Sequence, residues 1–68
     1  MSNQKDLSII IPFYNEEKSI NEVANKLIST FSESKLVFID DGSTDKSLEY
    51  IKKIKNKNIK ILINEFNS

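Results

Sequence analysis

The sequence predicts an α/β fold in which three parallel strands alternate with two helices, in the order β-α-β-α-β. Three short runs, residues 7–12, 36–39 and 59–63, are largely apolar and rich in β-branched side chains, which is typical of strands buried on both faces. The segments between them carry apolar residues at helical spacing. Connections of helical length imply parallel strands joined by right-handed crossovers.

The first strand, residues 7–12, is closed by Pro12 and followed by a short loop. Asn15 is expected to cap the next helix, with Glu16 and Glu17 in its first turn, where negative charge is favoured. One apolar stripe then marks the face of this helix that turns toward a core. Its members are Ile20, Val23, Ala24, Leu27, Ile28 and Phe31.

The second strand leads directly into Asp40, Asp41 and Gly42. Gly42 permits a sharp turn, and Ser43 or Thr44 is suited to cap a helix over about residues 44–55. A polar break at residues 56–58 precedes the third strand. Adjacent carboxylates repel each other unless a hydrogen-bond donor or a cation meets them, so this turn is a candidate site.

A strand order of 3-2-1 would place both helices on one face of the sheet. The strands are nevertheless apolar on both faces, since Ile10 alternates with Ile9 and Ile11 in the first of them. A bare apolar face is an association or aggregation surface. We therefore expect residues 1–6 to form a polar tail and residues 7–68 to be the opening half of a larger domain.

Composition excludes several classes of function. The 68 residues allow one small domain, and the absence of Cys and His excludes disulfides, thiolate or imidazole zinc sites and histidine acid/base catalysis. Ten basic and ten acidic residues cancel, which argues against a nucleic-acid partner held by net charge. No signal peptide or spanning segment is recognisable, so a cytoplasmic location is expected.

Two loops at the carboxyl ends of neighbouring strands are expected to share one crevice, where open parallel sheets bind ligands. Residues 12–16 supply an aromatic ring, Tyr14, and a carboxylate, Glu16. Residues 40–43 supply two further carboxylates. A ring to stack on and acceptors for ring N–H and sugar hydroxyl groups suit a nucleoside.

The segment Ile-Ile-Ile-Pro-Phe-Tyr-Asn-Glu at residues 9–16, followed by Val-Phe-Ile-Asp-Asp-Gly-Ser-Thr-Asp at residues 37–45, resembles the opening of family 2 glycosyltransferases. That family has the GT-A fold, which is Rossmann-like. The similarity runs from Leu7 to the end of the chain. It implies that this segment forms the nucleotide half of the site for a nucleotide-sugar donor.

Carried over to this sequence, the resemblance implies that Pro12 and Tyr14 border the base, with Tyr14 packing on it, and that Glu16 contacts the nucleoside. Ile39 would lie alongside the base, and Asp41 would accept a hydrogen bond from it.

Two further acids belong to the motif. Asp40 is expected to be a supporting residue. Asp45 matches the last acid of the motif, although helix capping explains it equally well.

The family's metal-binding Asp-x-Asp motif and its catalytic base lie downstream of the matching segment, so no catalytic or metal residue is assigned here. Asp40 and Asp41 are adjacent and belong to the nucleotide motif. The resemblance implies inverting transfer from a UDP- or GDP-linked sugar to an acceptor hydroxyl or a polyprenyl phosphate. A divalent cation, Mg²⁺ or Mn²⁺, is expected in the complete enzyme, while this chain alone is expected to be inactive.

Other interpretations remain beside this one. Tyr14 could pack on the following helix, Glu16 is a natural first-turn acid, and Asp41-Gly42 is an ordinary turn dipeptide. A dinucleotide-binding half-domain is disfavoured, because Gly42 is the only glycine and G-x-G-x-x-G is absent. A non-catalytic remnant or interaction module that uses the bare sheet face for a partner or for self-association is the alternative function. Membrane association is left open.

Overall fold

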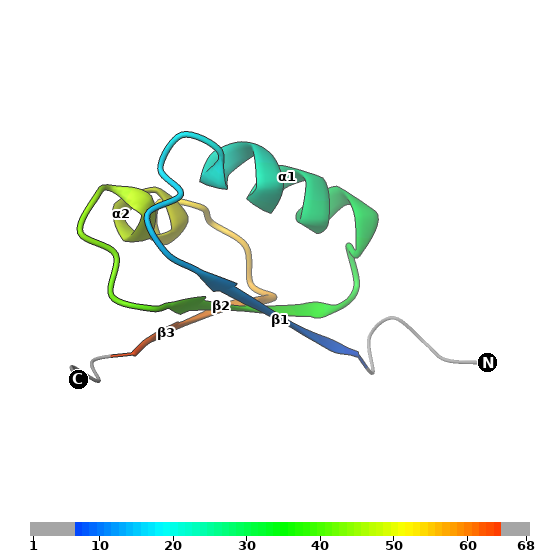
Figure 1. Ribbon diagram of the computed structural model, residues 1–68. Helices are drawn as coiled ribbons and strands as arrows, with labels where there is room; N and C mark the ends of the chain where they lie inside the picture. Colours follow the sequence, from blue (N-terminus) through cyan, green and yellow to red (C-terminus); the bar gives the residue numbers. More distant parts are fainter. Residues whose placement is uncertain (1–6, 65–68) are drawn as a thin grey trace.

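The computed structural model describes residues 7–64 and confirms the α/β fold (Figure 1). One parallel sheet has the strand order β1-β2-β3, and the helices alternate with the strands along the chain. The elements are β1 (Ser8–Phe13), α1 (Ile20–Thr30), β2 (Lys35–Asp40), α2 (Ser47–Lys52) and β3 (Ile59–Ile63). The expected polar tail, residues 1–6, and residues 65–68 lie outside the described residues.

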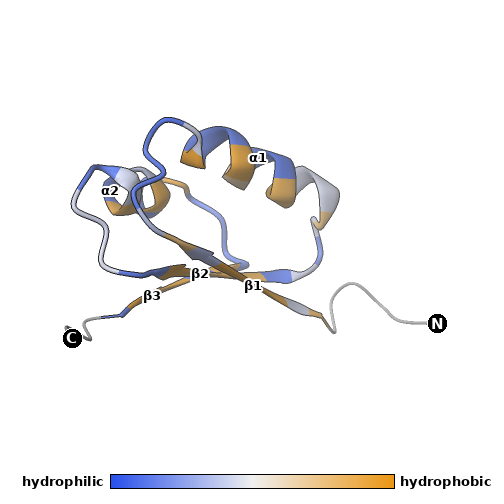
Figure 2. Ribbon diagram, in the orientation of Figure 1, coloured by the Kyte–Doolittle hydropathy of each residue, from blue (hydrophilic) through white to orange (hydrophobic). Residues whose placement is uncertain are grey.

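Both helices lie on the same face of the sheet, as expected for this strand order (Figure 1). The parallel register aligns Ile11 with Phe38 and Phe38 with Ile61, so alternate residues of all three strands point toward the helices. Figure 2 shows that α1 is hydrophobic on the side that faces the sheet and hydrophilic on the other. This helix layer and the sheet enclose one core.

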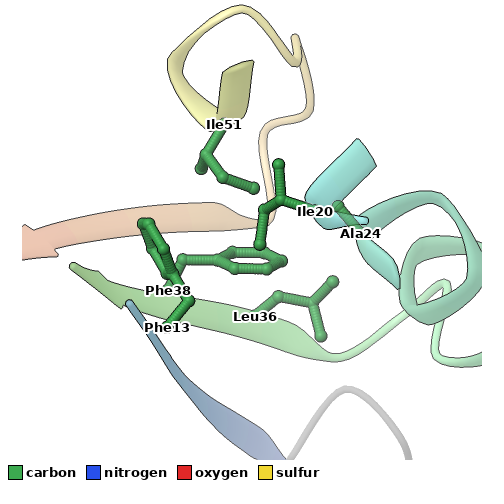
Figure 3. Close-up of a cluster of buried hydrophobic side chains, with 6 residues drawn as sticks. All are labelled: Phe13, Ile20, Ala24, Leu36, Phe38 and Ile51. Atoms are coloured by element: carbon green, nitrogen blue, oxygen red, sulfur yellow. The ribbon is translucent and has the colours of Figure 1, made fainter. Parts of the chain in front are cut away.

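The core is built around the central strand (Figure 3). Phe38 is fully buried, and its ring meets that of Phe13 edge to face, with centroids 6.5 Å apart and an interplanar angle of 67°. The buried hydrophobic residues are Phe13, Ile20, Ala24, Leu36, Phe38 and Ile51. Phe13 belongs to this core at the same point where β1 ends, so the core anchors the start of the following loop.

The second face of the sheet is covered by neither helix (Figure 1). Ile10 is 56% exposed and Leu62 43% exposed, and Val37 and Ile39 of the central strand lie half-buried between them. We call Ile10, Pro12, Val37, Ile39 and Leu62 the open sheet face. The strands are therefore apolar on both sides, while the described residues cover one side.

The boundaries of both helices differ from the sequence prediction. Helix α1 begins at Ile20, with Ser19 as its N-cap, so the prediction that Asn15 caps it is wrong. Helix α2 spans Ser47–Lys52, shorter than the predicted 44–55, and neither Ser43 nor Thr44 caps it. Both helices begin later than predicted because Asn15 and the residues at 43 and 44 bond to each other across the two loops. No helix within residues 7–64 has the length and apolar character needed to cross a membrane.

Candidate functional site

The loops that follow β1 and β2 meet at the carboxyl edge of the sheet. Because β1 and β2 are parallel neighbours, their ends lie side by side. The pairing continues past the strands, since the Asp41 backbone N–H donates to the carbonyl of Phe13 at 2.9 Å. The side chains at the start of each loop are thereby brought to one place.

Five residues from these two segments line an open hollow of about 380 Å³, namely Pro12, Phe13, Tyr14, Glu16 and Asp41. Four of them are predicted site residues, and Phe13 was not predicted. Tyr14 is 53% exposed, so a face of its ring is available to a ligand. We call this space the Tyr14 hollow. It combines an aromatic surface with two carboxylates from different loops.

Ile39, the fifth residue predicted to contact the nucleotide, does not line the hollow. It is half-buried in β2, in register with Pro12 on one side and Leu62 on the other. It therefore adjoins the hollow through Pro12 and belongs to the open sheet face.

Asp40 shapes the turn that carries Asp41. It is only 3% exposed, and its Oδ1 accepts a hydrogen bond from the Ser43 backbone N–H at 2.9 Å. Between them Gly42 has φ 89°, in the left-handed region that glycine adopts without steric cost. The buried carboxylate thus closes a tight turn and leaves the next side chain, Asp41, at the hollow.

Asp41 has a protein partner that sequence reasoning missed. Its Oδ1 accepts a hydrogen bond from Nδ2 of Asn64 at 2.9 Å, and the Asn64 backbone N–H donates to the carbonyl of Asp40 at 2.8 Å. Asn64 directly follows β3, so the rule that groups strand ends at one edge could have identified it. A carboxylate has about four acceptor positions, which leaves capacity for a ligand N–H.

The two loops are joined by hydrogen bonds in both directions through Asn15. The Asn15 backbone N–H donates to Oγ of Ser43 at 2.9 Å. In return, Oδ1 of Asn15 accepts from the backbone N–H groups of Thr44 at 2.7 Å and Asp45 at 3.3 Å. Sequence reasoning treated Asn15 only as a helix cap and missed this contact.

A second set of contacts surrounds Asp45. Its Oδ2 accepts from the Glu17 backbone N–H at 3.1 Å, and its Oδ1 accepts from the Ser47 backbone N–H at 2.9 Å and the Ser47 hydroxyl at 2.6 Å. The same hydroxyl oxygen accepts from the Glu16 backbone N–H at 2.7 Å. Asp45 and Ser47 therefore fix residues 16 and 17 as well as the entry to α2.

The Asp45 carboxylate has a pKa below its usual value. Desolvation by the surrounding loops acts to raise this pKa, but the hydrogen bonds from the Ser47 hydroxyl and from backbone N–H groups, those of Ser47 and Glu17 among them, outweigh it. Hydrogen bonds to a charged acceptor stabilise the ionised form, so Asp45 acts here as an anionic acceptor for the two loops.

Within residues 7–64 there is no group of three or more Asp, Glu, His or Cys residues placed to hold a metal ion. The Tyr14 hollow offers an aromatic face, two carboxylate acceptors and a neighbouring apolar strip of Pro12 and Ile39. These groups suit a flat, heteroaromatic ligand that carries N–H and hydroxyl donors.

The sequence of this chain is similar to those of known glycosyltransferases. The model of the family described as "Glycosyl transferase family 2" matches residues 8–68. An uncharacterized glycosyltransferase of Haemophilus influenzae is 40% identical over 68 residues, covering 96% of this chain. The poly(ribitol-phosphate) beta-N-acetylglucosaminyltransferase TarS of Staphylococcus aureus is 42% identical over 65 residues, covering 90% of this chain. An undecaprenyl-phosphate 4-deoxy-4-formamido-L-arabinose transferase of Photorhabdus laumondii is 37% identical over 51 residues, covering 69% of it.

The matched regions are a small part of each relative. They make up 27% of the Haemophilus protein, 11% of TarS and 16% of the Photorhabdus transferase. No solved structure gave a significant match.

Proposed function

Because this chain belongs to glycosyltransferase family 2, we propose that residues 7–68 form the nucleotide-binding part of an inverting glycosyltransferase that uses a nucleotide-diphosphate sugar. The observation that carries this proposal is the convergence of Tyr14, Glu16 and Asp41 on one hollow at the carboxyl edge of the sheet. Open parallel sheets bind their ligands at this edge.

Each residue has a proposed role in the Tyr14 hollow. Tyr14 packs on the base, and Asp41, oriented by Asn64, accepts a hydrogen bond from a ring N–H. Glu16 accepts from a hydroxyl group of the nucleoside. Pro12 and Ile39, neighbours across the β1–β2 ladder, border the base on its apolar side.

The donor is proposed to be UDP- or GDP-linked, and the acceptor to be a hydroxyl group or a polyprenyl phosphate. One relative is named for poly(ribitol-phosphate) and another for undecaprenyl-phosphate, which is a polyprenyl phosphate. The Tyr14 hollow recognises the nucleoside, which every such reaction shares, so it does not by itself distinguish the two acceptors.

A divalent cation, Mg²⁺ or Mn²⁺, would neutralise the departing diphosphate in the complete enzyme. In this proposal the ligands of the ion, and the base that activates the acceptor, are not in this chain. The 68-residue chain is accordingly proposed to bind nucleotide without transferring sugar.

Calorimetric titration of the purified chain with UDP and with GDP, with and without Mn²⁺, tests the proposal once its mass in solution has been measured. Saturable binding that does not need Mn²⁺ is expected. A well-folded monomer that binds neither nucleotide would contradict the proposal.

A second candidate, favoured by the exposure of Ile10 and Leu62, is an interaction module that associates through the open sheet face. Parallel sheets are ordinarily covered on both faces, so this surface has a physical reason to acquire a partner. Self-association of the chain without nucleotide affinity would favour this candidate over the first.

A further inference from the structure

We propose that Asn15 is a positioning residue of the Tyr14 hollow: its side-chain oxygen holds the loop after β2 against the loop after β1, and so keeps Tyr14 and Glu16 opposite Asp41. The inference rests on the proposed function, because it concerns the geometry of the same site. It differs from that function in naming a residue that acts through others and does not touch the ligand.

The backbone of Asn15 is in an uncommon conformation. Its φ of 50° makes it the one non-glycine residue with positive φ within residues 7–64. Asn is among the few residues that adopt the left-handed region at modest cost. Tyr14 and Glu16, which both line the hollow, flank it directly. The turn at Asn15 therefore sets the direction in which the chain presents both of these side chains.

The Asn15 side chain connects this turn to the other loop. Its Oδ1 accepts from two successive backbone N–H groups, those of Thr44 at 2.7 Å and Asp45 at 3.3 Å. It also lies 3.4 Å from the Thr44 hydroxyl, which donates to it. These partners are 29 and 30 positions away in the sequence, so the contact ties together segments that local structure alone would leave independent.

A further hydrogen bond joins the same two loops in the opposite direction, since the Asn15 backbone N–H donates to Oγ of Ser43 at 2.9 Å. Ser43 is in turn held by Asp40, whose carboxylate accepts from its backbone N–H. A continuous path of hydrogen bonds thus leads from the turn at Asn15 to the buried end of β2. Asp41, the proposed acceptor for the base, is the residue that follows this end.

Asn15 itself does not line the Tyr14 hollow. It lines a separate hollow of about 410 Å³ with Glu16, Glu17, Lys18 and Asp45. A role in direct contact with the nucleotide is therefore not what the geometry indicates. The side chain faces the opposite loop, which is the placement expected of a positioning residue.

Three substitutions at Asn15 distinguish the contribution of its side-chain acceptor from that of its backbone conformation. Asn15→Asp keeps an Oδ1 acceptor and tolerance of positive φ, Asn15→Gly keeps only the backbone freedom, and Asn15→Ala keeps neither. Asn25→Ala, on the exposed surface of α1, is the matched control. UDP and GDP affinity by calorimetry and hydrogen exchange of individual backbone N–H groups by NMR are measured for all four variants and the parent chain.

The expected result is a ranking. Asn15→Gly and Asn15→Ala weaken nucleotide binding by about fivefold, as expected for the loss of one or two neutral hydrogen bonds, whereas Asn15→Asp and Asn25→Ala stay nearer the parent chain. The N–H groups of Thr44 and Glu16 exchange faster in the Gly and Ala variants, while those of Phe38 in β2 are unchanged. Local loosening with an intact sheet is the signature that separates positioning from general stability.

If the Asn15→Gly variant binds nucleotide as tightly as the parent chain, although its Thr44 backbone N–H exchanges faster, the positioning role is wrong. Unchanged exchange at Thr44 and Glu16 in both the Gly and Ala variants would overturn the loop contact itself. Failure of the parent chain to bind either nucleotide counts against the proposed function alone, and the exchange measurements still decide whether Asn15 holds the loops together. If the Asn15→Ala variant does not fold, the positioning role is tested by comparing the nucleotide affinity and backbone N–H exchange of Asn15→Gly with those of Asn15→Asp.

Discussion

Asn64 donates a hydrogen bond from Nδ2 to Oδ1 of Asp41 at 2.9 Å and so connects the end of β3 to the turn after β2. The two residues lie 23 positions apart in the sequence. The Asn64 backbone N–H also donates to the carbonyl of Asp40, which places the Asn64 side chain beside the turn. All three strands of the sheet therefore contribute to the surroundings of the proposed base-binding carboxylate.

This relationship predicts the effect of Asn64→Ala. Without the amide donor the Asp41 carboxylate loses its fixed orientation, and nucleotide affinity should fall by about 0.5–1.5 kcal/mol, the net value of a typical hydrogen bond. Calorimetry with UDP and GDP measures the change. Asn64→Gln, which keeps a donor on a longer side chain, should lie between the parent and the Ala variant; equal affinity in all three would show that Asp41 does not need Asn64.

Asp41→Ala should weaken nucleotide binding more than Asn64→Ala does. It removes a charge-assisted hydrogen bond to the base, which typically contributes about 1.5–3 kcal/mol. Asp41→Asn retains one oxygen acceptor without the charge and should lose less. Glu33→Ala, an exposed acid at the opposite end of β2, is the control for loss of negative charge. If Asp41→Ala and Glu33→Ala bind nucleotide equally well, Asp41 is not the acceptor.

Tyr14→Ala tests the aromatic surface of the hollow. Stacking of a base on an aromatic side chain contributes about 1–3 kcal/mol, so the Ala variant should bind UDP and GDP correspondingly more weakly. Tyr14→Phe keeps the ring and should bind nearly as the parent does. Because Tyr14 is half exposed and outside the buried core, neither change should alter the thermal unfolding midpoint much. Weak binding by Tyr14→Phe as well would assign the contribution to the hydroxyl group and not to the ring.

The strands and their parallel order could be predicted because strands buried in an α/β sheet are continuous apolar runs. The strand ends could not be placed as well, since they depend on pairing. Strand β1 runs one residue further than predicted, to Phe13, which the Phe38 ring and the Asp41 backbone N–H hold in the sheet. The composition of the strand itself does not indicate such partners, which lie elsewhere in the sequence.

The grouping of Tyr14 with Asp41 could be predicted from topology, because adjacent parallel strands end at the same edge. The position of Asn15 could not. Local rules favour Asn before acidic residues as a helix cap. In the structure, Oδ1 of Asn15 instead accepts hydrogen bonds from the backbone N–H groups of Thr44 and Asp45 in the other loop. Contacts between distant loops depend on the arrangement of the whole fold, so a single sequence reveals them only where a motif already does.

Stability in acid should depend on Asp45. Its pKa is lowered in the folded chain, so its contribution is present above the pKa of an unfolded Asp, about 3.9, and is lost as the pH falls through the lower folded value. Denaturant titrations at pH values from about 6 to 2 measure this dependence. The Asp45→Asn variant is measured beside the parent chain, because it removes the ionisable group of Asp45 alone. That variant should lose stability at neutral pH and show a shallower decline below pH 4; an unchanged profile would show that the Asp45 hydrogen bonds do not stabilise the loops.

The open sheet face predicts how the chain behaves in solution. Ile10 and Leu62 are the most exposed of its large aliphatic side chains, and their burial against a second surface is favourable by about 25 cal/mol for each Å² removed from water. Thr is β-branched and suits a strand, but its hydroxyl group makes the surface less apolar. Replacing both residues by Thr should therefore reduce concentration-dependent association in sedimentation velocity. Val23→Thr, an exposed aliphatic residue on α1 away from this face, is the matched control and should leave association as in the parent. If the double variant associates as strongly as the parent, association does not use the open sheet face, and the alternative function loses the observation that supports it.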